Sequence, residues 1–88
     1  MRFWTNTLTS GSLTLNAADG AFFISILTES SGSGCSVVGG IPFKQINPTP
    51  VILENGEGVN FSALSPASPL DGITITHISG SIDIIIGF

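Results

Sequence analysis

Charged side chains are what this sequence has least of. Asp, Glu, Lys and Arg make up only 9% of its 88 residues, and Arg2 and Lys44 are its two basic ones. Globular proteins usually carry about 25% charged residues. Nucleic-acid binding needs clustered basic side chains that contact phosphates, so a net charge of −4 predicts that nucleic acid is not a partner.

Cysteine and histidine are each present once, as Cys35 and His77. A single cysteine forms no disulfide within the chain, which fits a protein made in a reducing compartment. A structural metal site needs several His or Cys ligands. We therefore expect no metal ion and no cofactor.

Long apolar runs are also missing. No stretch approaches the roughly 18–20 apolar residues of a membrane helix, so we expect no membrane partner. The first residues, "MRFWTNTLTSG", become polar after Trp4. They lack the apolar segment of about 7–15 residues that marks a signal peptide, so we expect the chain to be made in the cytoplasm.

The chain is nevertheless apolar enough to fold. Hydrophobic residues make up 42% of it and the mean hydropathy is +0.52, whereas disordered chains have low hydrophobicity. We expect one domain over residues 1–88. A domain of this size buries only about 60–65% of its unfolded surface, and most soluble domains cover the rest with charge. We infer that this chain hides much of its surface in an assembly.

Apolar and polar residues alternate with a period of two along most of the sequence, and helix signals are scarce. The pattern predicts an all-β fold, a compact β-sandwich or jelly roll of about eight short antiparallel strands. An intertwined β-structure completed by neighbouring subunits is the alternative. The proline-rich segments 42–50 and 65–72 are predicted to be an extended connection and a loop. The predicted strands cover residues 3–9, 12–16, 21–28, 35–41, 51–54, 59–64, 72–78 and 81–88.

Three dipeptides predict hairpin turns: Asp19-Gly20, Asn55-Gly56 and Ser79-Gly80. In the last of these hairpins, "GITITHISGSIDIIIGF", we expect four cross-strand pairs and two distinct faces. The predicted pairs are Ile78 with Ser81, His77 with Ile82, Ile75 with Ile84, and Ile73 with Ile86. The predicted core face holds Ile73, Ile75, His77, Ile82, Ile84 and Ile86. The opposite face is predicted to be partly solvent-exposed and holds Thr74, Thr76, Ile78, Ser81, Asp83 and Ile85.

No group of residues matches a catalytic site. His77 has Asp83 as its nearest carboxylate in sequence, but the two fall on opposite predicted faces, so we expect a hydrogen-bonded or partly solvated histidine. Cys35 has no cation or helix N-terminus nearby to activate it and is predicted to be a small buried residue. We expect the scattered carboxylates to be solvated. The sequence thus predicts no enzyme, no catalytic residue and no small-molecule substrate.

The exposed aromatic and aliphatic residues are better candidates for protein contacts. Phe3 and Trp4 could stack on a sugar, but sugar sites usually gather several aromatics beside polar groups. Aromatic residues are also enriched at interface cores. The predicted interface residues are Phe3, Trp4, Ile78, Ile85 and Phe88.

The segment "PVILENGEGVNFSALSPASPLDGITITHISGSIDIIIGF", which covers about the last forty residues, resembles small all-β virion proteins of tailed bacteriophages. The similarity lies in a "GEGVNFSA"-like strand, the following "PLDGITIT" and an Ile-rich closing strand. It implies a capsid decoration protein, a head fibre component or a tail-associated subunit. Such proteins are commonly oligomeric, so the resemblance implies further copies of the chain and other virion proteins as partners, and it carries no catalytic residues across to this chain.

Two functions from different classes follow. The first is a non-enzymatic structural subunit located in the virion and made in the host cytoplasm, with a homo-oligomer, a trimer by our guess, as its assembled state. The second is a β-sandwich binding module for a glycan or a host surface. Its predicted sites are the loops 29–34, 42–50 and 65–72.

Overall fold

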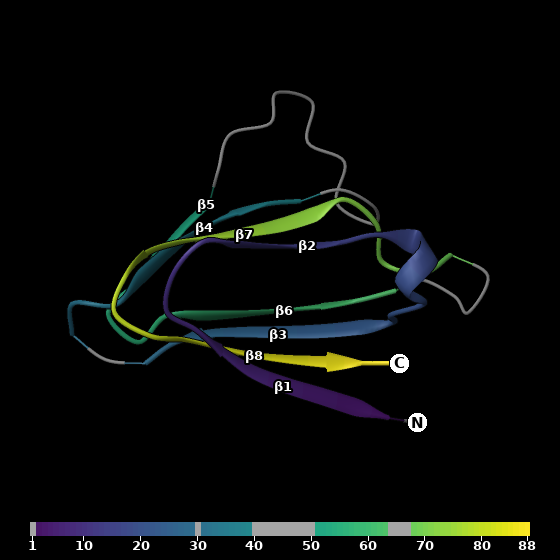
Figure 1. The fold of residues 1–88 in the computed structure, drawn as a ribbon, viewed down its shortest axis with the longest axis horizontal. Helices are drawn as coiled ribbons and strands as arrows, with labels where there is room; N and C mark the ends of the chain where they lie inside the picture. The colour runs from purple at the N-terminus through teal and green to yellow at the C-terminus, as the bar shows by residue number, and fades with distance from the viewer. Residues whose placement is uncertain (1, 30, 40–50, 64–67) are drawn as a thin grey trace.

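The computed structural model describes residues 2–29, 31–39, 51–63 and 68–88, which form eight strands and one short 3-10 helix (Figure 1). The helix, η1, spans Ala17–Asp19. The strands are β1 (Phe3–Leu8), β2 (Ser12–Leu15), β3 (Phe23–Thr28), β4 (Gly34–Val38), β5 (Val51–Glu54), β6 (Gly58–Ser62), β7 (Ile73–Ser79) and β8 (Ile82–Gly87).

The strands form two four-stranded antiparallel sheets packed face to face. Sheet A has the order β1-β8-β3-β6 and sheet B has the order β2-β7-β4-β5. Figure 1 shows sheet B as the upper layer and sheet A as the lower one. The predicted all-β sandwich of eight short antiparallel strands is confirmed, and the strand order is that of a jelly roll.

The pairing scheme explains this order. β1 pairs with β8, β2 with β7, β3 with β6, and β4 with β5. These four pairs follow one another along the chain as one long antiparallel two-stranded ribbon. The ribbon is wound so that β3 also meets β8 and β4 also meets β7, which completes the two sheets. As a result β4 and β5 are the only consecutive strands of the described chain that pair with each other.

The core lies between the sheets and is built from alternate residues of each strand. The isoleucine rows of β7 and β8 supply its centre, one row from each sheet. Burying these side chains stabilises the fold by about 2 kcal/mol for each one that is fully removed from water. The buried apolar residues are Leu15, Ala21, Ile24, Ile26, Cys35, Val37, Leu53, Leu70, Ile73, Ile75, Ile82, Ile84 and Ile86.

The pairing predicted for the last two strands was wrong, although the predicted core face holds: its five isoleucines are buried, and His77, near the end of β7, is half-buried opposite the buried Cys35. β7 lies in sheet B and β8 in sheet A, so none of the four predicted cross-strand pairs forms. Ile73 and Ile75 nonetheless face the core from one sheet, as Ile82 and Ile84 do from the other. The residues Ser79–Ser81 therefore form an arch between sheets. Period-2 alternation sorts residues by face, but it is the same for strands that lie side by side and for strands stacked face to face.

The other two predicted hairpins were wrong for the same reason. Asp19-Gly20 follows β2 of sheet B and leads into β3 of sheet A. Asn55-Gly56 does adopt turn geometry, with φ of 55° and 89°, and the Glu57 N–H donates to the Glu54 carbonyl at 3.1 Å. That turn nevertheless joins β5 of sheet B to β6 of sheet A. A tight turn reverses the chain locally, while long-range packing decides which strands pair.

The remaining expectations concern the strand 21–28 and the predicted loops. β3, which falls within the predicted strand 21–28, lies between β8 and β6 and is a central strand of sheet A. Of the predicted loop 29–34, residues 29 and 31–33 lie between β3 of sheet A and β4 of sheet B, Gly34 begins β4, and residue 30 is outside the described part. The predicted extended connection at 42–50 lies outside the described residues, as do residues 65–67 of the second proline-rich segment.

Candidate interaction surfaces

The outer face of sheet A carries exposed apolar side chains. The register forms rows across β1, β8 and β3: one row runs from Phe3 through Gly87 to Phe23, and another runs from Thr5 through Ile85 to Ser25. Three apolar side chains of this face are strongly exposed: Phe3 at 60%, Leu27 at 45% and Ile85 at 40% of their surface. Single exposed apolar residues are ordinary, whereas several on one sheet face make that face a candidate contact surface.

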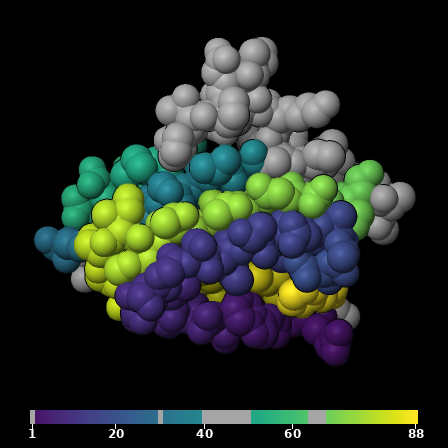
Figure 2. Space-filling model, turned by 45° about the horizontal axis from the view of Figure 1, so that its top comes forward, coloured from purple at the N-terminus to yellow at the C-terminus, as the bar shows by residue number. Residues whose placement is uncertain are grey.

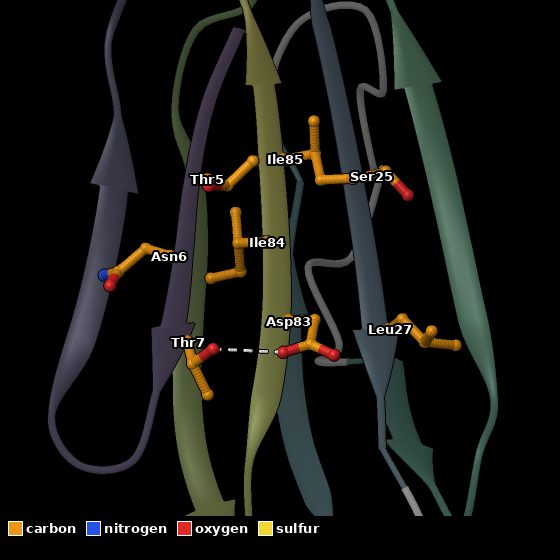
Figure 3. A pocket seen from close by; sticks show the side chains of 8 residues that line it. All are labelled: Thr5, Asn6, Thr7, Ser25, Leu27, Asp83, Ile84 and Ile85. Atoms are coloured by element: carbon orange, nitrogen blue, oxygen red, sulfur yellow. Dashed lines mark hydrogen bonds between the residues drawn. The ribbon is translucent and has the colours of Figure 1, made fainter.

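A shallow hollow of about 610 Å³ lies on this face (Figure 3). Hydroxyl groups from β1 and β3 line it together with the Asp83 carboxylate from β8. The Thr7 hydroxyl donates a hydrogen bond to Asp83 Oδ1 at 3.1 Å. The hollow therefore offers polar groups beside an apolar floor. Its lining residues are Thr5, Asn6, Thr7, Ser25, Leu27, Asp83, Ile84 and Ile85.

A second carboxylate lies next to this hollow. Glu29 follows β3 directly, and its N–H donates to the Ser81 carbonyl at 3.2 Å. The negative charge of Asp83 raises the pKa of Glu29, and partial desolvation and a hydrogen bond between the two carboxyl groups act in the same direction. Asp83 lies on β8, a central strand of sheet A, and places a negative charge on the outer face of that sheet.

The open edge between β1 and β2 gathers aromatic residues from both ends of the chain. Trp4, 41% exposed, and Phe88 both line a hollow of about 200 Å³ and a second one of about 350 Å³. The Arg2 and Phe88 backbones exchange two hydrogen bonds, at 2.8 and 3.2 Å, which fixes the C-terminus beside β1. Figure 2 shows the yellow C-terminal residues at the surface between the purple first strand and the blue second strand.

The five predicted interface residues thus occupy three places. Phe3 and Ile85 lie on the outer face of sheet A, and Trp4 and Phe88 lie at the open edge. Phe88 is only partly exposed and packs against the core, which accounts for the apolar C-terminus within the chain itself. Ile78, 56% exposed, lies on the outer face of sheet B and is not brought together with the other four.

Three further apolar residues are exposed that are not among the predicted interface residues: Leu27, Val51 and Ile52. Leu27 belongs to the stretch 22–27, which has apolar residues at both odd and even positions and so only a weak alternation. Its alternation with Phe23 and Ser25 was the signal that could have placed it on an outer face. Val51 and Ile52 belong to β5, an edge strand of sheet B, where even the core-facing Val51 is 49% exposed. Nothing in the short segment "VILE" marks it as an edge.

His77 and Cys35 are cross-strand neighbours in sheet B. His77 is half-buried, and its Nε2–H donates to the Gly80 carbonyl at 2.7 Å, so the expected hydrogen-bonded histidine is confirmed. Asp83 lies in the other sheet and does not orient it. Cys35 is fully buried at the start of β4, also as predicted, and burial raises the pKa of its thiol.

Within the described ranges there is no cluster of three or more His, Cys, Asp or Glu side chains that could hold a metal ion. The same residues contain no helix that is long and apolar enough to cross a membrane. Comparisons of the chain with protein-family models, with curated proteins and with solved structures found no match.

Proposed function

We propose that the chain is a non-enzymatic structural subunit of a phage virion. In this role it assembles into a homo-oligomer and binds other virion proteins. A capsid decoration protein, a head fibre component and a tail-associated subunit are the three roles that fit. The supporting observation is the combination of exposed apolar side chains on both sheet faces with only 9% charged residues. A free monomer usually covers such surface with charge.

The strand order supports the same proposal more weakly. Jelly rolls with two four-stranded sheets are common in viral capsid domains, but the same architecture occurs in lectins and cupins. An architecture alone does not define a function. The two-sheet topology is compatible with the proposal, because it leaves two outer sheet faces and four edge strands at which neighbours could bind.

Analytical ultracentrifugation of the purified chain at micromolar concentration tests the assembly part of this proposal. We expect a defined oligomer, for which the sequence suggested three copies. A stable monomer that binds no virion protein would refute the assembly. The genes adjacent to the coding sequence test the location: capsid, portal or tail genes are expected there, and metabolic genes alone would contradict a virion role.

A glycan-binding module is the second candidate, because of the hollow on the outer face of sheet A. Its hydroxyl groups and the Asp83 carboxylate can bond sugar hydroxyls, while Leu27 and Ile85 offer apolar contact. This site lies on a sheet face, whereas the sequence placed it in loops. A glycan array probed with the wild-type chain and with Asp83→Ala tests it: binding that the variant loses is expected, and an array without hits would dismiss it.

A further inference from the structure

We infer that β1 is a self-recognition edge, through which two copies of the chain pair antiparallel about a two-fold axis. Sheet A of one copy would then continue into sheet A of the second as one eight-stranded sheet. This rests on the proposed assembly and names the contact that builds it. It also gives a two-fold contact in place of the guessed trimer.

The backbone of β1 is prepared for such pairing on one side. The reciprocal hydrogen bonds between Arg2 and Phe88 fix the phase of the β1–β8 ladder. Bonded and non-bonded pairs alternate along an antiparallel ladder. The even-numbered residues of β1 therefore bond to β8, and the N–H and C=O groups of Phe3, Thr5 and Thr7 point to the open edge. No backbone group among the described residues bonds to that edge.

The strand also lacks the features by which proteins protect an edge. Such features are Pro, Lys, an inward-pointing charge, a bulge or a very short strand. β1 reads "FWTNTL", contains none of these residues, and pairs with β8 without a register shift. It is six residues long, against four each for the edge strands β2 and β5 and five for β6. β1 is the longest unprotected edge in the described part of the chain.

The side chains of β1 suit a second copy of the same strand. With the two-fold axis at Thr5, this residue faces its own equivalent, and Phe3 faces Thr7 of the second copy. On the core side Trp4 faces Asn6 and lies diagonal to the second Trp4, a spacing that aromatic rings can bridge. No side chain of β1 is charged. Although each chain has a net charge of −4, the two β1 strands would therefore pair without placing like charges opposite each other.

The test uses opposite charges at the two-fold axis. Thr5→Lys and Thr5→Glu each place like charges opposite each other in a homodimer, while an equimolar mixture of the two variants pairs opposite charges. Thr14→Lys and Thr14→Glu are the matched controls, because Thr14 is also an exposed threonine on an edge strand, in β2. Thr5→Pro removes an N–H that faces the open edge and leaves the bonds to β8 in place.

Sedimentation velocity at micromolar concentration gives the readout, with circular dichroism melts to verify that each variant is folded. We expect a wild-type dimer, dissociation constants at least about fivefold higher for Thr5→Lys and Thr5→Glu, and a heterodimer in their mixture. Thr5→Pro should be monomeric, and the Thr14 variants should dimerise like the wild type.

Three results would overturn the inference, and they have different consequences for the proposed function. A wild-type oligomer that the Thr5 variants do not weaken means that assembly uses another surface, and the structural role stands. A wild-type trimer excludes the two-fold contact and likewise leaves that role intact. A wild-type chain that stays monomeric throughout the micromolar range removes both the β1 contact and self-assembly.

Discussion

Gly80 lies in the arch between β7 and β8, and replacing it with alanine should damage the fold severely. Its φ is +66°, a region that side chains with a Cβ rarely adopt. An added Cβ would meet Ser33 at 2.7 Å from its Cα, at 2.9 Å from its Cβ, and still closer to its hydroxyl oxygen. Both the backbone angle and the available space therefore oppose the methyl group.

Ser33 cannot easily move away. It is 5% exposed, its carbonyl accepts the Asn55 N–H at 3.0 Å, and its hydroxyl accepts the Ser81 N–H at 3.3 Å. We expect about 1–2 kcal/mol from the positive φ and a further ~1–3 kcal/mol from the overpacking. Small domains unfold at a cost of about 5–15 kcal/mol, so Gly80→Ala should remove a large part of the stability.

Gly11→Ala is the matched control. Gly11 has a φ of +74°, but a Cβ there would meet no atom within 4 Å. Both variants share the backbone strain and the effect of alanine on the unfolded chain. Urea unfolding, followed by far-UV circular dichroism, should therefore show Gly80→Ala as the less stable of the two by about 1–3 kcal/mol. Equal losses for the two variants would refute the close approach to Ser33.

Three further predictions follow from burial and charge. Ile84→Asp places an unpaired charge at a residue that is 1% exposed and should cost several kcal/mol, while Thr74→Asp on the half-exposed outer face of sheet B should cost only about 1 kcal/mol in thermal melts. Comparable damage from both would show that the outer face is also buried, in an interface. Burial and the raised pKa of Cys35 predict that a thiol reagent labels the native chain far more slowly than the urea-unfolded chain, and equally fast labelling would contradict the buried position. Asp83 raises the pKa of Glu29 in the folded state, so the folded chain holds the Glu29 proton more tightly than the unfolded chain does. The stability that Glu29 contributes is therefore fully present below pH 4.5, its ordinary pKa, and is lost as the pH rises through the raised pKa. Asp83→Asn should lower the pKa of Glu29 in an NMR titration, and an unchanged pKa would exclude Asp83 as its cause.

The candidate surfaces were predictable only in part. Phe3 and Trp4 were predictable as interface residues because aromatic residues are enriched at interface cores. Ile85 and Ile78 stand out as apolar residues in otherwise polar rows. The hollow on sheet A was not predictable, because it joins Thr7, Asp83 and Ser25 from three strands that only the register brings together.

The sequence alone determined the all-β class, the approximate limits of the strands and, for most residues, the face on which each side chain lies. It could do so because a period of two and the turn residues are local properties of the chain. Only the tertiary structure decided which strands are neighbours. The turn "SG" serves a hairpin and an arch equally well, and burying the isoleucine rows of β7 and β8 against each other across the core selected the arch. That choice also left β1 as a long open edge.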